Sequence, residues 1–185
     1  MPEPSDQWLV RDAIPDRDAE ACLAIYAPFV LNTAVSFEEV APTVDELRDK
    51  MRAITATHAW LVAEIDGKVA GYAYGSTHRP RAAYRWTAEV TIYLGPDHRG
   101  KGLGRRLYKE LLERLRRQGY HLACAGITLP NDASVGLHKA VGFQPVGTYH
   151  RMGWKLGAWH DVTWLELQLA PITDQAPAEP IHSGL

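Results

Sequence analysis

The chain has 185 residues, which is enough for one domain with a sizeable core and short for two. Apolar residues make up 46% and charged residues 23%, which excludes a mostly disordered, collagen-like or disulfide-scaffold protein. Lysine and arginine number 20 against 22 acidic residues, giving a net charge of -2 that argues against wholesale binding to nucleic acid or an anionic membrane.

The composition changes once, near the C-terminus. We expect a single domain over residues 1–170 and a disordered tail over residues 171–185, because the tail has prolines and few large apolar groups. No apolar stretch approaches the ~20 residues needed to cross a bilayer, so no membrane association is expected. Cys22 and Cys124 each lie in an apolar run and are predicted to be buried free thiols, which indicates a cytoplasmic protein.

The first elements alternate between strand and helix. A short strand is predicted at 8–14, and apolar residues at helical spacing follow over 21–29. Thr43 and Glu46 form a capping box that begins a second helix, whose apolar face continues to Ile54. A tight hairpin with an Asp-Gly turn then joins two strands, at 60–65 and 69–74.

The second half contains a strand-helix-strand unit. A strand at 88–94 ends at Gly95-Pro96, since proline cannot donate to a ladder. An amphipathic helix is predicted, with apolar residues from 103 to 115 and an end near Gln118-Gly119, and then a buried strand at 122–128. The remaining predicted elements are a short helix at 133–141 and strands at 146–152 and 162–169. The pattern predicts an α/β (or α+β) fold with one mixed sheet.

A glycine-rich loop, Arg99 to Gly104, separates the strand at 88–94 from the amphipathic helix. Glycines allow close approach of the backbone to a ligand, and a helix N-terminus offers unpaired N–H groups and partial positive charge. The loop therefore predicts a site for a phosphate-bearing ligand; the alternative is a flexible turn with a solvated cationic helix start. Arg105 after Gly104 excludes a Walker loop, and the third glycine comes one residue too early for a dinucleotide fingerprint.

The loop and its neighbours resemble the GNAT superfamily of N-acetyltransferases. The resemblance rests on Arg99-x-x-Gly102-x-Gly104 and on Asn131, Ser134, His138 and Gly142-Phe143 downstream. Further blocks resemble the phosphinothricin N-acetyltransferases of that superfamily: Trp60 to Glu64, Tyr84 to Glu89, Leu129 to Asp132 and Trp159 to Asp161. The resemblance implies the GNAT fold, a central mixed sheet flanked by helices, with acetyl-CoA as cosubstrate, no metal, and a homodimer.

Two residues are candidates for proton transfer. Strand alternation places Glu89, Thr91 and Tyr93 on one face, and a carboxylate at the start of an apolar strand suits the mouth of a cleft. The alternative for Glu89 is a solvated strand-end carboxylate, whereas the resemblance implies the general base. His138, on the short helix predicted at 133–141, is a histidine, whose ordinary pKa suits proton transfer near neutral pH. The alternative is that it serves only packing or the surface, which is more common for a lone histidine on an amphipathic helix. The resemblance favours a catalytic role for His138 and leaves open whether it is an acid or a second base.

The cofactor would lie along the strand end and the glycine loop. Backbone groups of the strand are expected to bind the pantetheine arm as an added strand would, and loop N–H groups the pyrophosphate. The predicted cofactor-binding residues are Ile92, Tyr93, Leu94, Arg99, Gly100, Lys101, Gly102, Leu103, Gly104, Arg105 and Asn131.

The substrate is expected beside Tyr84 and the segment that precedes it, and Tyr84 is itself a predicted substrate-binding residue. A carboxylate or phosphinate suits a guanidinium fork, and Arg81 aligns with an arginine of the resembled family; Arg79 is a second candidate. Solvated loop charges are the alternative for both. Phe37 is expected to wall the pocket. The eight histidines lack metal-binding spacing, so no metal site is predicted.

The resemblance implies an acetyl-CoA-dependent N-acetyltransferase that acts on the α-amino group of phosphinothricin, methionine sulfoximine or a similar small amino acid. No obligatory serine or cysteine nucleophile stands out, which favours direct attack in a ternary complex. The alternatives are an acetyltransferase for another small amine or a protein N-terminus, and a non-catalytic acetyl-CoA-binding sensor. A sensor would need only the loop, so the presence of Glu89 and His138 argues against it.

Overall fold

The computed structural model describes residues 8–182 and shows one seven-stranded sheet in the order β1-β2-β3-β4-β5-β7-β6. The strands are β1 (Leu9–Asp12), β2 (Trp60–Ile65), β3 (Lys68–Thr77), β4 (Thr87–Leu94), β5 (Leu122–Thr128), β6 (Gln144–Lys155) and β7 (Ala158–Gln168). Neighbouring strands are antiparallel, apart from the parallel pair β4 and β5. The mixed sheet with its flanking helices confirms the predicted α/β fold class.

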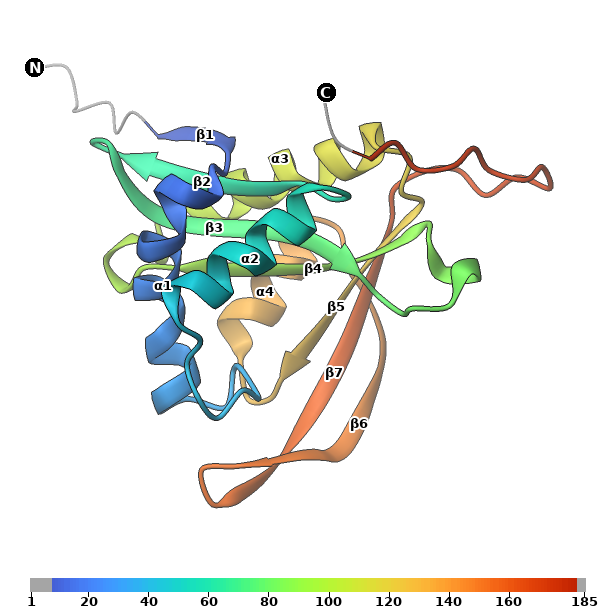
Figure 1. The fold of residues 1–185 in the computed structure, drawn as a ribbon. Helices are drawn as coiled ribbons and strands as arrows, with labels where there is room; N and C mark the ends of the chain where they lie inside the picture. Colours follow the sequence, from blue (N-terminus) through green and yellow to red (C-terminus); the bar gives the residue numbers. More distant parts are fainter. Residues whose placement is uncertain (1–7, 183–185) are drawn as a thin grey trace, which may run out of the picture.

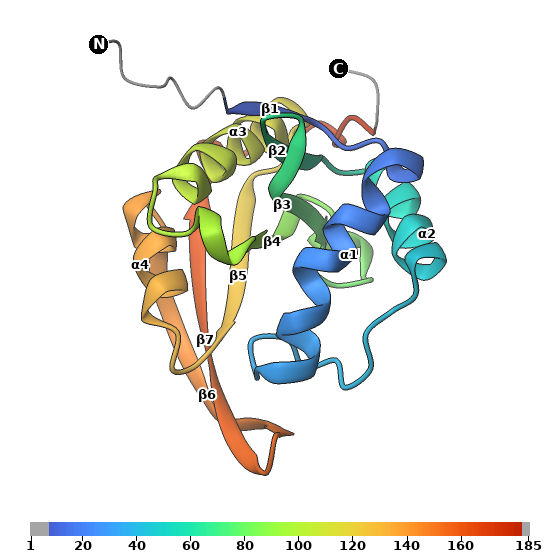
Figure 2. The same cartoon turned by 90° about the vertical axis from the view of Figure 1, so that its left-hand side faces the viewer.

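Helices cover both faces of the sheet. The α-helices are α1 (Pro15–Asn32), α2 (Val44–Thr55), α3 (Leu103–Arg117) and α4 (Asp132–Ala140). Figure 1 shows α1 and α2 in front of the sheet, and Figure 2 shows α3 and α4 on the opposite face. Each layer has its own core: Leu107 and Leu111 of α3 pack in one, and Cys22 and Met51 of the other layer pack in the second.

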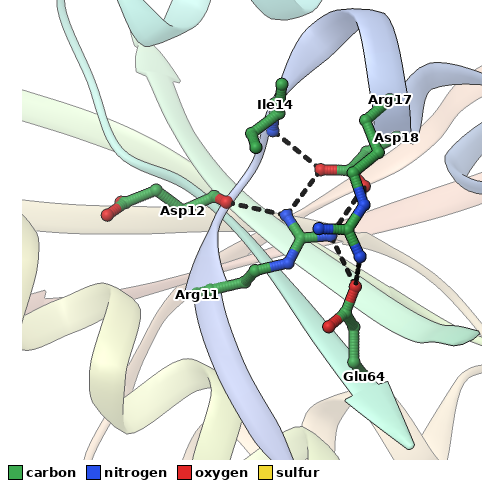
Figure 3. A network of polar contacts seen from close by, with 6 residues as sticks. All are labelled: Arg11, Asp12, Ile14, Arg17, Asp18 and Glu64. Carbon is green, nitrogen blue, oxygen red and sulfur yellow. Dashed lines mark hydrogen bonds and ion pairs between the residues drawn. The ribbon is translucent and has the colours of Figure 1, made fainter. Parts of the chain in front are cut away.

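An ionic network, buried except for Arg17, links β1, the start of α1 and β2 (Figure 3). Both oxygens of Asp18 accept hydrogen bonds from the guanidinium of Arg11 at 2.7 Å, and Asp18 Oδ2 also accepts one from the N–H of Ile14. Arg11 and Arg17 share a second carboxylate, that of Glu64 on β2. The network fixes the start of α1 against the edge of the sheet.

The structure differs from the sequence prediction in its C-terminal part. The closing hairpin β6–β7 is longer than predicted and projects past the rest of the sheet (Figure 1). Residues 171–182, for which a disordered tail is predicted, run as an extended segment that contacts residues far along the chain. The N–H of Ile181 donates to the carbonyl of Gln118, and the indole of Trp86 donates to that of Ala178. Residues 183–185 of the predicted tail lie outside the described residues.

Within residues 8–182, the helices fall short of the combined length and apolar character that a membrane span requires.

Candidate active site

The two parallel strands at the centre of the sheet separate after a short ladder. In the described chain, β4 and β5 are paired from Thr87 and Leu122 to Glu89 and Cys124. Beyond this point β4 stays paired with β3, and β5 with β7, while the facing edges of β4 and β5 diverge. The edge of β4 from Val90 to Tyr93 therefore offers free backbone groups to an extended ligand, as the sequence predicted for a pantetheine arm.

A cavity of ≈ 90 Å³ occupies the gap between the diverging strands. Val35 and Tyr93 line it from the layer of α1 and α2, whereas Tyr108 and His138 line it from the layer of α3 and α4. The gap is therefore open to groups from both faces of the sheet. On the α3 and α4 side, a ligand in this gap meets two candidate proton-transfer groups, Tyr108 and His138.

Glu89 lies at the point where the strands separate. Its side chain is 33% exposed, and Oε2 lies 3.1 Å from Nδ1 of His78. Glu89 shares its face of β4 with Tyr93, which packs edge-on against Tyr26 of α1. Strand alternation thus places the carboxylate on the α1 side of the gap, where it can accept a proton from an incoming ammonium group.

A larger cavity, of ≈ 450 Å³, adjoins Glu89. His78 and Cys124, both close to Glu89, line this cavity, together with Arg79, Tyr84 and groups of the β6–β7 hairpin. Its mixture of aromatic, polar and cationic groups suits a small zwitterionic ligand. The structure therefore brings two of the predicted substrate residues, Arg79 and Tyr84, to a pocket beside the candidate base.

His138 approaches the gap from the opposite face and is 2% exposed. Burial lowers its pKa below the ordinary value, against the opposing effect of the Ser134 carbonyl, and so favours the neutral ring. Nδ1 then donates to that carbonyl at 2.7 Å, and Nε2 accepts from the hydroxyl of Tyr108 at 2.9 Å. This arrangement favours a proton-accepting role for Nε2 of His138 over a role as an acid.

The glycine loop leads from the end of β4 into α3. Gly100 and Gly102 have φ angles of 72° and 84°, which favour glycine, and Gly102 is the N-cap of α3. The first N–H groups of α3 therefore face the loop without side-chain caps. Arg99 turns back, and its guanidinium donates to the carbonyl of Leu94 at 3.3 Å. This cradle fits a pyrophosphate group.

Gly102→Val is expected to weaken acetyl-CoA binding by about tenfold or more. A β-branched residue at a positive φ costs about 1–3 kcal/mol, so the loop would leave the conformation that aligns its N–H groups. Calorimetric titration with acetyl-CoA measures the effect. Gly157→Val is the matched control, because Gly157 has a φ of 75° in the distant hairpin. An unchanged affinity in the Gly102 variant would remove the phosphate assignment.

Other predicted cofactor residues also have structural roles. Leu103 is buried in the core, and a Cβ at Gly104 would meet Leu94 and Leu137 at 3.1 and 3.2 Å, so this glycine permits close helix packing. Asn131 caps α4 by accepting from the N–H of Ser134, and it also lines the gap.

Phe37, Arg81 and the Trp159-His160-Asp161 segment lie away from the lining of both cavities. The ring of Phe37 packs over Gly153 in the hairpin, and Arg81 is an exposed residue of the loop after β3. Asp161 accepts from the N–H of Arg151 within the hairpin. These placements indicate a structural role for the Trp159-His160-Asp161 segment in the hairpin.

Tyr108, His78 and Cys124 line the two cavities of the candidate site, and the sequence analysis did not single them out as site residues. Tyr108 occupies an ordinary apolar position of an amphipathic helix. His78 and Cys124 meet only because β4 pairs with both β3 and β5, a contact without a local sequence signal. The one sequence signal for His78 is its position directly before Arg79, in the segment predicted to bind the substrate.

Separation of two parallel strands beside a glycine cradle gives an acyl thioester a backbone edge for its arm and a helix N-terminus for its phosphates. An acyltransferase that uses a coenzyme A thioester is the class of enzyme that this arrangement defines. The acetyltransferase (GNAT) family matches residues 28–143, and the chain belongs to this family. It is an N-acetyltransferase with acetyl-CoA as its cosubstrate.

Similar proteins agree with this assignment. A phosphinothricin N-acetyltransferase of Streptomyces viridochromogenes is 37% identical over 164 residues, which are 89% of this chain and 90% of that protein. An L-methionine sulfoximine/L-methionine sulfone acetyltransferase of Pseudomonas aeruginosa is 38% identical over 86% of this chain and 94% of that protein. The crystal structure of a Sinorhizobium meliloti phosphinothricin acetyltransferase with acetyl-CoA has a TM-score of 0.89 and 35% identity, covering 94% of this chain and 95% of that one.

Proposed function

We propose that the enzyme acetylates the α-amino group of a small amino acid of the phosphinothricin or methionine sulfoximine type. The observation that carries this proposal is the position of Glu89, between a cavity suited to a zwitterion and the gap that exposes the edge of β4. Relatives named for these two substrates cover most of the chain, which supports the same substrate class.

The reaction we propose is direct attack within a ternary complex. Acetyl-CoA supplies the thioester, whose C–S bond breaks as the amine nitrogen bonds to the carbonyl carbon. Glu89 takes one proton of the ammonium group. The second proton, released as the amide forms, passes to the departing thiolate on the side that Tyr108 and His138 face. Burial raises the pKa of both Cys22 and Cys124 to about 12, which makes either thiol a poor nucleophile and disfavours an acyl-enzyme.

Release of free thiol from acetyl-CoA tests the proposal. The purified protein should release thiol faster when phosphinothricin or methionine sulfoximine is added, and little without an amine. Stimulation by other amines or peptides alone would favour the alternative acceptors. Acetyl-CoA binding without thiol release for any amine would instead indicate a non-catalytic sensor.

Arg79→Ala is expected to raise KM for the amino acid roughly 10- to 100-fold. The reason is the loss of a charge-assisted hydrogen bond to the substrate carboxylate or phosphinate, which contributes about 1.5–3 kcal/mol. KM for acetyl-CoA should barely change. Arg81→Ala tests the arginine that the resemblance favours, and Arg85→Ala is a control, since Arg85 pairs with Glu179 away from the cavity. Equal losses for both substrates would point to a structural role instead.

Two proposals concern the setting of the enzyme. The resemblance implies a homodimer, and the hairpin carries exposed apolar groups such as Trp154 and Trp159 that a second copy could cover. Sedimentation should then give twice the mass of one chain. We also propose a cytoplasmic location, which the free thiols Cys22 and Cys124 support.

A further inference from the structure

Three metal-ligating side chains from different segments meet beside the larger cavity. Nδ1 of His78 lies 3.1 Å from Oε2 of Glu89 and 3.3 Å from Sγ of Cys124, and the three donor atoms lie within 4.8 Å of one another. The ladder holds them in place, because Glu89 is paired with Cys124, and Thr77, next to His78, is paired with Ala88.

The donor set is that of a zinc site. Imidazole nitrogen, thiolate and carboxylate are the ligands that zinc takes, and three protein ligands with an open fourth position are a common arrangement. Ligands at about 2.0–2.3 Å from a tetrahedral zinc stand roughly 3.3–3.8 Å apart, so small movements of the side chains would bring these donors into range. The cavity of ≈ 450 Å³ gives an ion access and leaves room for a water as fourth ligand.

We propose that His78, Glu89 and Cys124 bind a zinc ion that inhibits the enzyme by competing with the amino-acid substrate. Binding forms bonds from zinc to Nδ1, the carboxylate and Sγ, and the thiol proton passes to solvent. A coordinating metal deprotonates a thiol outright, so the protonated state of free Cys124 is no obstacle. The bound zinc ion coordinates the Glu89 carboxylate, which then cannot accept the proton of the amine. The inhibition therefore rests on the proposed role of Glu89 as the base, whereas the binding of zinc does not.

Spectroscopy tests the binding independently of catalysis. The metal-free protein is titrated with Co²⁺, whose bond to a thiolate gives a charge-transfer absorption band, and with Zn²⁺ by calorimetry. We expect one saturable site with the thiolate band. Cys124→Ser should remove the band. Both Cys124→Ser and His78→Phe should weaken zinc binding by more than about tenfold, because loss of a residue that only supports a ligand already costs about that much and loss of a ligand should cost more. Cys22→Ala, which changes the other buried thiol, should keep both signals.

Kinetics then test the inhibition. Zinc should raise the apparent KM for the amino acid in the wild-type enzyme without changing that for acetyl-CoA. An absence of saturable binding, or binding that survives both ligand variants, would overturn the zinc site. Zinc binding with the thiolate band but without inhibition would overturn the proposed competition with the amino acid, and it would count against Glu89 as the base. The acetyltransferase reaction itself is tested separately, by the thiol-release assay.

Discussion

Asp18→Ala should lower the free energy of unfolding by about 3 kcal/mol, because removing one partner of a buried ion pair leaves the other charge poorly compensated. Asp18 is 1% exposed, and both of its oxygens accept from Arg11 (Figure 3). Arg11 keeps Glu64 as a partner in the variant, which places the loss at the lower end of the range for such changes. Urea unfolding of both proteins measures it.

The same network gives the stability a pH dependence of defined sign. Burial opposes ionisation of Asp18, but hydrogen bonds from Arg11 and the Ile14 N–H, with the charges of Arg11 and Arg17, outweigh it and hold its pKa below the ordinary value. A lowered pKa in the folded state contributes stability above the unfolded pKa of about 3.9, and this is lost as the pH falls through the folded value.

Wild-type unfolding free energy should therefore fall below about pH 4–5, and the Asp18→Ala variant should show a flatter profile over that range. Asp45→Ala is the control, since the exposed pair of Asp45 with Arg48 contributes little. Equal stability losses for the two variants, or parallel pH profiles for wild type and Asp18→Ala, would show that the buried network does not contribute in this way.

Elements with strong local signals were predicted well from the sequence. The capping box of Thr43 and Glu46 is present, with the N–H of Glu46 donating to the Thr43 hydroxyl, and β5 spans Leu122–Thr128 as predicted. Such signals need only neighbouring residues. The extended hairpin and the packed segment after residue 170 depend on partners far along the chain, such as Gln118 for Ile181, and no local pattern predicts them.

The site shows the same division. Alternation along β4 predicted the face of Glu89, and helical spacing placed His138 four residues after Ser134. Local sequence patterns did not predict which side chains contact Glu89 and His138, although these contacts determine how the two residues can transfer protons. Tyr108 meets His138 across two helices, and His78 meets Glu89 across two strands, so these contacts follow from register and packing of the complete sheet.

Glu89→Gln should lower kcat by ~10²–10⁴-fold, the usual contribution of a positioned general base. The amide keeps the size of the side chain but cannot accept the ammonium proton, so KM for acetyl-CoA should change little. Glu166→Gln is the matched control, because Glu166 lines the same large cavity from β7 but does not stand where β4 and β5 separate. That variant should keep its kcat.

The rate of the Glu89→Gln enzyme should recover at high pH, where more of the amine is already unprotonated and the missing base matters less. Steady-state kinetics across the pH range, with both substrates varied in turn, separate this chemical effect from a loss of binding. If the variant keeps the wild-type kcat, the proton leaves by another route. The neutral His138, whose Nε2 accepts from Tyr108 on the far side of the gap, would then be the base to test, with His138→Asn and Tyr108→Phe as the variants.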